Sequence, residues 1–348
     1  MRPRLGILAL LLGLPALSAA GWAQLAPSPD APPVSTAPAP TEEKSVATFK
    51  LNVNLVDVFF TVKAKDGTLV PHLTKDDCTI TEDKEPQTLK SFVAETQLPI
   101  TLGILLDTSG SQQRVLPLEQ DVASQFLQRA LRQKDEAFLL SFDVNVDLMQ
   151  DYTNSVRLLT RALNKAEINT AGGNGAAGIP GAGGGTVPTI GDPKGTVLYD
   201  AVYLAANEKL TQESGRKAMI LLTDGEDEGS SHKIQEAIAA AERSNVIVYV
   251  ILIADRGFYG GFGYSGYSAM SRLTQETGGR LIDVGNNGKK LEAAFQQIED
   301  ELRTQYVATY TPSNTKLDGT FRKLGVECRG DGMKVQVRKG YFATPPEN

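Results

Sequence analysis

The middle of the chain contains two kinds of hydrophobic pattern, which follow one another in turn. Short continuous apolar runs, such as residues 100–106, are typical of strands buried on both faces of a parallel sheet. Longer segments between them repeat apolar residues every three or four positions, as amphipathic helices do. The predicted strands are residues 100–106, 137–142, 146–149, 218–222, 246–253 and 280–283, and the predicted helices are residues 118–131, 155–166, 197–210, 231–243, 268–277 and 289–303. This alternation predicts an α/β fold with a doubly wound, mostly parallel sheet.

One strand of this sheet is expected to run against the others. Only Asp143-Val144-Asn145 separates residues 137–142 from residues 146–149. A connection this short joins antiparallel neighbours, because a parallel crossover needs a dozen residues or more. We therefore predict one antiparallel strand at an edge of the sheet.

The segments on either side of the α/β region read as β-structure. Strands are predicted at 49–56, 58–62, 78–82 and 89–93, with a hairpin turn at 65–68 and a second hairpin joining 78–82 to 89–93. Further strands are predicted at 306–310, 321–327 and 334–338. Either half is too small to close a core alone. The economical interpretation is one β-sandwich, split in the sequence by the α/β domain, and the alternative is two separate small β modules.

The N-terminal segment has the features of an export signal. Arg2 and Arg4 precede an apolar stretch that is too short to span a bilayer, and small residues follow. Residues 24–46 are rich in proline and alanine, which is typical of a disordered linker. The predicted organisation is a signal peptide at 1–23, a linker at 24–46, β segments at 47–97 and 304–343, an α/β domain at 98–303 and a tail at 344–348. We expect an exported protein, periplasmic or secreted, with no transmembrane segment after signal removal.

Charge content narrows the class of partner, and cysteine content suggests a cross-link. The chain has 35 basic and 41 acidic residues, a formal charge of −6, which makes nucleic acid a poor partner. Its only cysteines, Cys78 and Cys328, fall in the two β segments. Two cysteines in an exported protein suggest one disulfide, which here would join the two halves of the sandwich. Two buried free thiols are the alternative.

The chemistry of the chain concentrates where predicted strands end. Asp107, Ser109 and Ser111 follow residues 100–106, Asp224 follows another apolar strand, and Thr196 lies just before a predicted helix. Ligands bind at the carboxyl ends of strands in open α/β sheets. Carboxylate and hydroxyl oxygens are the ligands of hard cations such as Mg²⁺ and Ca²⁺. Helix capping could explain any one of these pieces, but not all three together.

These five residues resemble the metal-ion-dependent adhesion site of von Willebrand factor A-type domains. Flanking segments extend the resemblance, from about residue 47 to 343, to the VWFA-related family of exported acidobacterial proteins; they include residues 53–58, 73–77, 306–312 and 338–342. The resemblance implies that Asp107, Ser109, Ser111, Thr196 and Asp224 hold Mg²⁺, with Mn²⁺ or Ca²⁺ as alternatives. It also implies a protein partner whose Asp or Glu carboxylate completes the site. One departure from the family is Cys78, where we expect an aromatic residue, and a disulfide with Cys328 would explain it.

Two loops are expected to rim the site. Residues 172–191 are rich in glycine, and residues 256–267 follow a predicted parallel strand. Aromatic side chains in the second loop are candidate binding anchors, namely Phe258, Tyr259, Phe262, Tyr264 and Tyr267. They could equally pack on one another. Glu226, Asp227 and Glu228 follow Asp224 and would make the rim acidic, unless they belong to a solvated loop.

These features favour an exported binding or adhesion module over an enzyme. Neither His72 nor His232 falls in a motif with a nucleophile, and the motifs G-x-S-x-G and H-E-x-x-H do not occur. One alternative is a structural scaffold whose cation only orders the loops. A less favoured alternative is a metal-assisted hydrolase.

Overall fold

The computed structural model describes residues 55–94, 98–168, 195–253 and 266–343. The predicted signal peptide, the linker, the glycine-rich loop and the tail lie outside these ranges. Within them, no helix combines the length and apolar character needed to cross a membrane.

A six-stranded sheet forms the centre of the α/β region, in the order β10-β9-β8-β5-β6-β7. All neighbouring strands are parallel except β6 and β7, so the predicted antiparallel edge strand is confirmed. The strands are β5 (Ile100–Asp107), β6 (Glu136–Phe142), β7 (Val146–Thr153), β8 (Arg216–Thr223), β9 (Val246–Leu252) and β10 (Leu281–Asp283). Every residue of β5 and β8 is buried, as the continuous apolar runs predict.

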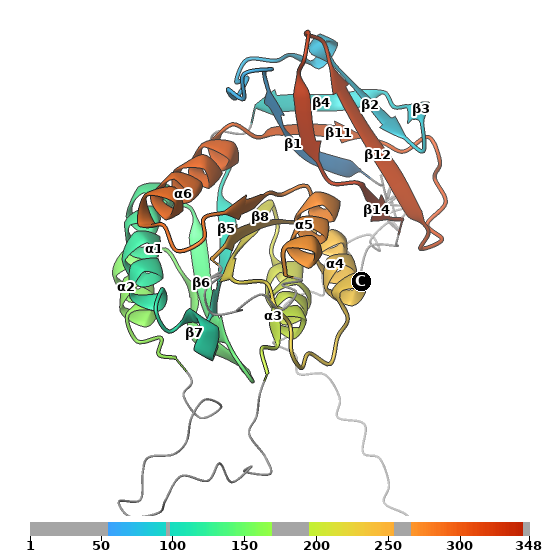
Figure 1. Ribbon diagram of the computed structural model, residues 1–348. Coiled ribbons are helices and arrows are strands. Elements are labelled where there is room, and N and C mark those ends of the chain that lie inside the picture. The colour runs from blue at the N-terminus through green and yellow to red at the C-terminus, as the bar shows by residue number, and fades with distance from the viewer. Residues whose placement is uncertain (1–54, 95–97, 169–194, 254–265, 344–348) are drawn as a thin grey trace, which may run out of the picture. The chain divides into compact units, whose positions relative to one another are not determined.

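Helices cover both faces of this sheet (Figure 1). α1 (Leu116–Ala130), α2 (Val156–Leu163) and α6 (Gly288–Arg303) pack on one face, and their apolar residues share one core with alternate residues of the strands. α3 (Leu198–Leu204), α4 (Ile234–Arg243) and α5 (Gly266–Thr277) pack on the other face, in a second core. A π-helical turn at Ala205–Lys209 continues α3. The predicted doubly wound α/β fold is therefore confirmed.

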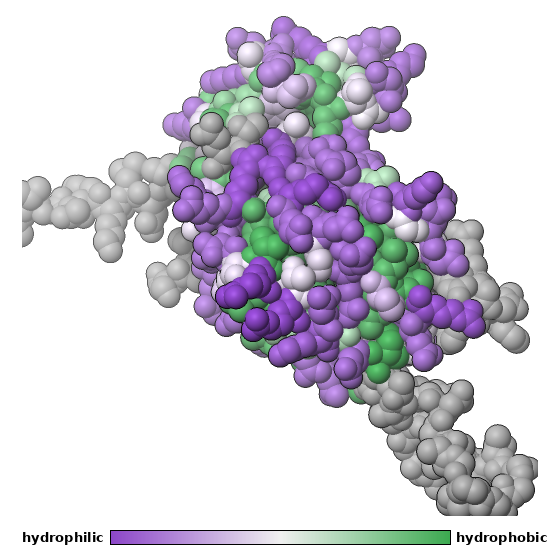
Figure 2. Space-filling view, turned by 90° about the vertical axis from the view of Figure 1, so that its left-hand side faces the viewer, coloured by the Kyte–Doolittle hydropathy of each residue, from purple (hydrophilic) through white to green (hydrophobic). Residues whose placement is uncertain are grey.

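The face shown in Figure 2 is mainly hydrophilic, with several apolar areas among the polar side chains. This distribution follows from the amphipathic pattern of the helices. In α1, for example, Val122 and Phe126 are buried against the sheet, whereas Asp121 on the same helix is exposed.

The flanking β segments form two four-stranded antiparallel sheets, ordered β13-β1-β11-β4 and β14-β12-β2-β3. Both sheets combine strands from before and after the α/β region, and their facing residues share one core. One split β-sandwich is therefore confirmed over two separate modules. Its strands are β1 (Val56–Lys63), β2 (Cys78–Glu82), β3 (Glu85–Pro86), β4 (Leu89–Ala94), β11 (Tyr306–Tyr310), β12 (Phe321–Cys328), β13 (Lys334–Val337) and β14 (Gly340–Phe342).

The predicted hairpin between residues 78–82 and 89–93 is wrong. β2 pairs with the two-residue strand β3 on one side and with β12 on the other. β4 leaves that sheet and pairs with β11 in the opposite sheet. A local hairpin would have left β11 and β12 without these partners, and the sandwich would not have closed across the insertion.

A disulfide and a buried polar cluster join the two halves of the sandwich. Cys78 and Cys328 lie opposite each other in the β2–β12 pair and form a disulfide across 250 residues of sequence. Beside them, the buried Glu82 carboxylate accepts hydrogen bonds from Tyr310 Oη at 2.6 Å and Tyr341 Oη at 2.8 Å, and it pairs with the Arg322 guanidinium at 2.9 Å. The buried carboxylate is thus satisfied entirely by residues from the second half.

Candidate metal centre

The candidate centre lies at the topological switch point of the central sheet, where the helices that follow two neighbouring strands leave to opposite faces. β5 and β8 are parallel neighbours, with Leu106 opposite Leu222. The helix that follows β5, α1, packs on one face of the sheet, and the helix that follows β8, α4, packs on the other. The carboxyl ends of the two strands therefore border the crevice in which doubly wound folds bind ligands. Asp107 ends β5, and Asp224 directly follows β8.

Asp107 is the centre of a compact group of oxygens. Its buried carboxylate accepts hydrogen bonds from Ser109 N at 3.0 Å and Ser109 Oγ at 2.6 Å, both on Oδ1. The Ser111 hydroxyl lies 3.0 Å from the Ser109 hydroxyl. On the other side, Thr223 Oγ1 donates to Asp107 Oδ2 at 2.6 Å. The structure therefore brings three of the five predicted ligands together.

Asp224 lies close enough to Asp107 for the two charges to interact. Burial, and then the charge of Asp224, raises the pKa of Asp107 to about 7. Asp224 is itself buried, and its Oδ1 accepts a hydrogen bond from Glu226 N at 3.1 Å. Two buried carboxylates side by side repel each other, and a cation between them would relieve that repulsion.

Thr196 is placed beside this group by its backbone. Its carbonyl oxygen accepts a hydrogen bond from Glu228 N at 3.0 Å, which ties it to the loop after Asp224. The next residue, Val197, donates its N–H to the Asp143 carbonyl oxygen at 2.7 Å, and Thr108 Oγ1 lies 3.3 Å from Asp143 Oδ2. Within the described ranges, no hydrogen bond joins the Thr196 side chain to Asp107 or Asp224.

Two of the three residues of the predicted acidic rim, Glu226 and Asp227, have a structural role. Glu226 Oε1 accepts a hydrogen bond from Gly266 N at 2.9 Å, at the start of α5. Asp227 Oδ1 accepts one from Tyr199 N at 3.1 Å, in the first turn of α3. These two carboxylates therefore bind helix N-termini, where negative charge is favourable, and anchor the loop that carries Asp224.

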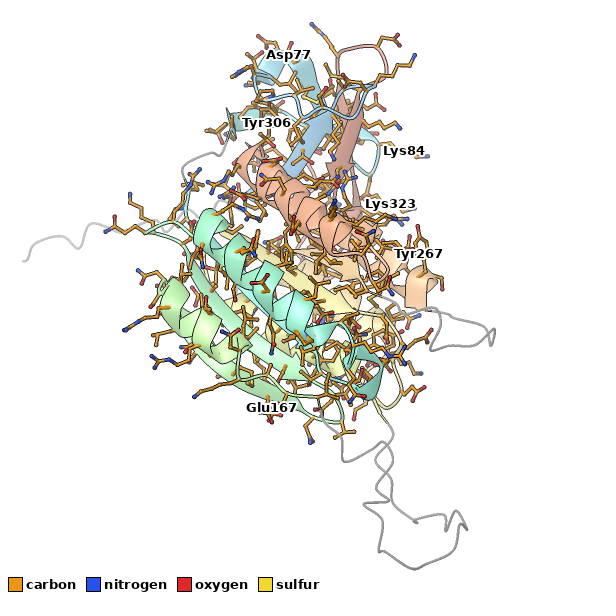
Figure 3. All side chains as sticks on the ribbon, turned by 60° about the vertical axis from the view of Figure 1, so that its left-hand side comes forward. Asp77, Lys84, Glu167, Tyr267, Tyr306 and Lys323 are labelled. Carbon is orange, nitrogen blue, oxygen red and sulfur yellow. A yellow bond between two sulfur atoms is a disulfide. The ribbon has the colours of Figure 1, made fainter. Side chains whose placement is uncertain are left out.

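One of the five predicted aromatic rim residues can be placed. Tyr267 lies in the first turn of α5 and is 51% exposed, and Figure 3 shows it at the edge of the molecule. Its neighbour Gly266 abuts the backbone of Asp224, where a Cβ atom would come within 2.5 Å of the Asp224 carbonyl oxygen. Tyr267 is thus next to the candidate centre. Phe258, Tyr259, Phe262 and Tyr264 lie outside the described residues.

Two polar residues near the centre do not stand out in the sequence: Thr223, which donates to Asp107, and Glu119, a buried glutamate on which the charges of Asp107 and Asp224 act. Thr223 belongs to the apolar run of β8, and a lone hydroxyl next to Asp224 was the available signal. Glu119 was overlooked because charged residues on helices are usually solvated. Its spacing was the signal, because it is three and four residues from the apolar positions Leu116, Val122 and Ala123, which all face the sheet.

The donor set fits a hard divalent cation. Asp107 and Asp224 would supply charge, and the hydroxyls of Ser109, Ser111 and Thr196 would supply neutral oxygens, which is the chemistry that Mg²⁺ prefers. In the described ranges, no group of three or more His, Cys, Asp or Glu side chains could hold one ion, so a cation here would need hydroxyl ligands beside the carboxylates.

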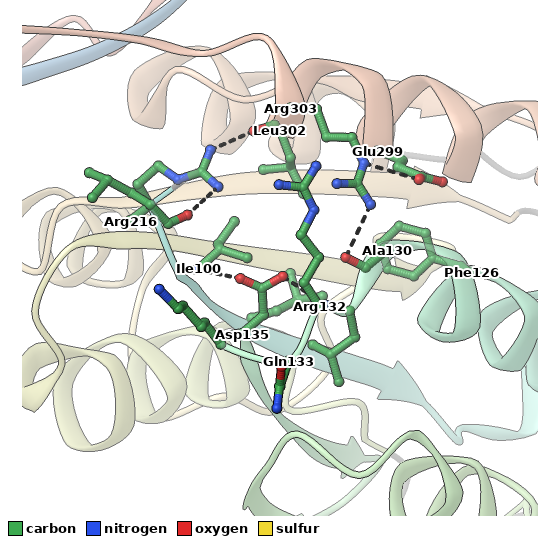
Figure 4. A pocket seen from close by; sticks show the side chains of 14 residues that line it. Ile100, Phe126, Ala130, Arg132, Gln133, Asp135, Arg216, Glu299, Leu302 and Arg303 are labelled. Atoms are coloured by element: carbon green, nitrogen blue, oxygen red, sulfur yellow. Dashed lines mark hydrogen bonds and ion pairs between the residues drawn. The ribbon is translucent and has the colours of Figure 1, made fainter. Parts of the chain in front are cut away.

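A cavity of about 160 Å³ lies at the other end of β5 (Figure 4). Ile100, which begins β5, lines it together with Phe126 and Leu302. Two of its polar side chains bind the backbone, since Asp135 accepts from Ile100 N and Arg216 donates to the Leu302 carbonyl oxygen, and two others, Glu299 and Arg303, pair with each other. The cavity is separate from the candidate centre.

Comparisons with known proteins give similarity only at the level of structure. No protein-family model matches the chain, and no curated protein matches it. BatB from Bacteroides thetaiotaomicron is 18% identical over 59% of this chain and 99% of its own, with a TM-score of 0.43. Proximal thread matrix protein 1 from the mussel byssus, in a structure with a zinc-occupied MIDAS motif, is 15% identical over 64% of this chain and 50% of its own, with a TM-score of 0.45. The PilB minor pilin from Streptococcus sanguinis is 13% identical over 60% of this chain and 62% of its own, with a TM-score of 0.41.

The chain thus spans half the length of the mussel protein. Its own strand order and helix placement define the class, an α/β protein with an oxygen-rich candidate cation centre at the topological switch point of its sheet.

Proposed function

We propose that this chain is an exported binding module that recognises a protein partner through a divalent cation. The observation that carries the proposal is the convergence of the Asp107, Ser109 and Ser111 oxygens at the end of β5, beside Asp224. Thr196, in the loop next to them, is the proposed fifth ligand. Mg²⁺ is the proposed cation.

The proposed recognition depends on the charge of the site. Asp107 and Asp224 supply all the negative charge of the proposed ligand set, and hydroxyl ligands add none. Where one of these carboxylates acts through a bound water, which Mg²⁺ retains readily, the cation keeps part of its positive charge and attracts one more anionic ligand. We propose that an Asp or Glu carboxylate of the partner is that ligand, with Tyr267 beside it as an apolar contact.

We propose binding and not turnover, because general-base chemistry is poorly supplied. The His232 ring is engaged with Asp200, with Nδ1 2.6 Å from Asp200 Oδ1, and it stacks on Tyr203 at a centroid distance of 3.8 Å. His72 is exposed and lies before β2, in the sandwich. This arrangement favours a structural role for His232 and gives Asp107 and Ser109 no histidine base.

The first test is calorimetric titration of Mg²⁺ into the EDTA-treated mature chain. We expect one bound cation in the wild type and none in Asp107→Ala. Asp121→Ala is the matched control, because it removes an exposed aspartate from α1 and should bind as the wild type does. Wild-type protein that binds no Mg²⁺ would refute the proposed centre.

A second measurement separates a binding site from a cation that only orders loops. Mn²⁺ bound with an exchangeable water enhances the relaxation of water protons, and acetate can stand in for the partner carboxylate. We expect acetate to lower the enhancement by displacing that water. No effect of acetate on bound Mn²⁺ would favour the structural scaffold. Cation-dependent hydrolysis of a generic ester would favour the hydrolase instead.

A further inference from the structure

Glu119 is a buried carboxylate that the five proposed ligands leave unexplained. It lies in the first turn of α1 and is 0% exposed. Neither Oε1 nor Oε2 has a hydrogen-bond partner in the described part of the chain. An ionised carboxylate without a partner is among the most costly groups to bury, so its presence requires a compensating interaction.

The course of the backbone directs Glu119 toward the candidate centre. α1 begins five residues after Ser111, and its inward face packs on β5 and β8. Glu119 belongs to that inward face, at the end of the helix nearest to the Asp107 turn. Gln112, in the same connection, is also buried with an unpartnered Oε1. The segment from Asp107 into α1 therefore carries buried oxygens that no donor satisfies.

Electrostatics link Glu119 to the same two aspartates. Burial raises the pKa of Glu119 well above its usual range, and the charges of Asp107 and Asp224 raise it further. No basic side chain contributes to this shift. Glu119 thus adds a third buried carboxylate to the field of Asp107 and Asp224, and a bound metal ion would relieve the repulsion among them.

We infer that Glu119 is a positioning residue of the cation site, a third carboxylate that strengthens cation binding through its charge. The inference rests on the proposed function, because it concerns the same cation. The three carboxylates are not grouped as common ligands of one ion. Glu119 therefore acts from outside the five-ligand set, and it does so through its charge, because neither of its oxygens has a hydrogen-bond partner among the described residues.

Glu119→Gln tests the inference, because it removes the charge and keeps the shape. We expect the Kd for Mg²⁺, measured by calorimetry on the mature chain, to rise about tenfold, or about 1.4 kcal/mol, which is within the effect of one nearby charge at a partly buried site. In EDTA, where no cation is bound, we expect the variant to be more stable than the wild type. It should melt at a higher temperature, because one of the three repelling carboxylates is gone. A carboxyl that is always protonated and merely fills space would leave the Kd for Mg²⁺ unchanged in the variant.

Glu299→Gln is the matched control. Glu299 is also a buried glutamate, but it pairs with Arg129 and Arg303 and lines the cavity at the opposite end of β5. We expect its Kd for Mg²⁺ to match the wild type. Glu119→Met serves if the glutamine variant does not fold, because an apolar side chain of similar length removes the charge without leaving a polar group unsatisfied.

The outcomes separate this inference from the proposed function. Wild type that binds Mg²⁺ with Glu119→Gln or Glu119→Met within twofold of it would overturn the role of Glu119 and leave the proposed centre intact. Wild type that binds no Mg²⁺ would overturn both. A tenfold loss in the Glu119 variants, with unchanged binding in Glu299→Gln, would support the third carboxylate.

Discussion

Removing the Cys78–Cys328 disulfide should strongly destabilise the sandwich. The bond joins β2 to β12 across the inserted α/β domain. A disulfide stabilises mainly by restricting the unfolded chain, and the restriction grows with the length of the closed loop. The double variant Cys78→Ser/Cys328→Ser should therefore lose several kcal/mol of unfolding free energy.

The magnitude depends on whether the α/β domain unfolds together with the sandwich. The two cysteines are 250 residues apart, and a loop of that length corresponds to roughly 5.5 kcal/mol in the chain-entropy relation. If the α/β domain stays folded while the sandwich melts, only about 50 residues between the cysteines remain loose, which corresponds to roughly 4 kcal/mol. The expected loss is thus about 4–5.5 kcal/mol, and native-state strain would lower it.

Guanidinium unfolding of the purified chain measures this loss. Far-ultraviolet circular dichroism follows mainly the helices of the α/β domain, and hydrogen exchange of the backbone amides of β2 and β12 follows the sandwich. We expect the sandwich transition to move to lower denaturant in the double variant, with a smaller effect on the helical transition if the domains melt in sequence. Both single variants should lose about as much as the double variant, because either one breaks the same bond.

Two results would refute this reasoning. A loss below about 1 kcal/mol would mean that the cross-link does not restrict the unfolded chain in the way the relation assumes. Single variants that lose much less than the double variant would mean that the serine side chains, and not the missing bond, cause the change.

Three further predictions concern the folded core. Burial and a neighbouring carboxylate raise the pKa of Glu242 from 4.5 to about 7. The folded protein should therefore lose stability as the pH rises from 4.5 through 7, by up to roughly 3 kcal/mol. Glu242→Gln should remove this pH dependence in thermal melts at several pH values. Gly103→Ala would place a Cβ atom 2.7 Å from the Phe138 ring and should cost about 1–3 kcal/mol, whereas an unchanged melting temperature would show that the ring moves freely. Arg322→Leu would leave Glu82 buried without its ion-pair partner and should cost about 3–5 kcal/mol in denaturant unfolding, with a smaller loss when Glu82→Gln is added.

The candidate centre was readable in the sequence where local position carries the information. Asp107, Ser109 and Ser111 are close together in the chain, so any strand-to-helix turn brings their oxygens close to one another. Asp224 could be added because the strand order of a doubly wound sheet makes β5 and β8 neighbours. Glu119 could not be added with the same certainty. Its spacing places it on the inward face of a helix, but only the packing of α1 shows which buried charges lie near it.

The sequence by itself determined the kinds of element and their order, because a period of two or of three to four residues reflects which side of a single strand or helix is buried. It could not determine which strands pair in the sandwich. β2 and β4 present apolar residues that either a local hairpin or a distant strand could cover, so the local pattern is the same in both cases. Only the tertiary structure decides that β2 pairs with β12 and β4 with β11. The two sheets close a common core only when strands from both sides of the inserted domain take part.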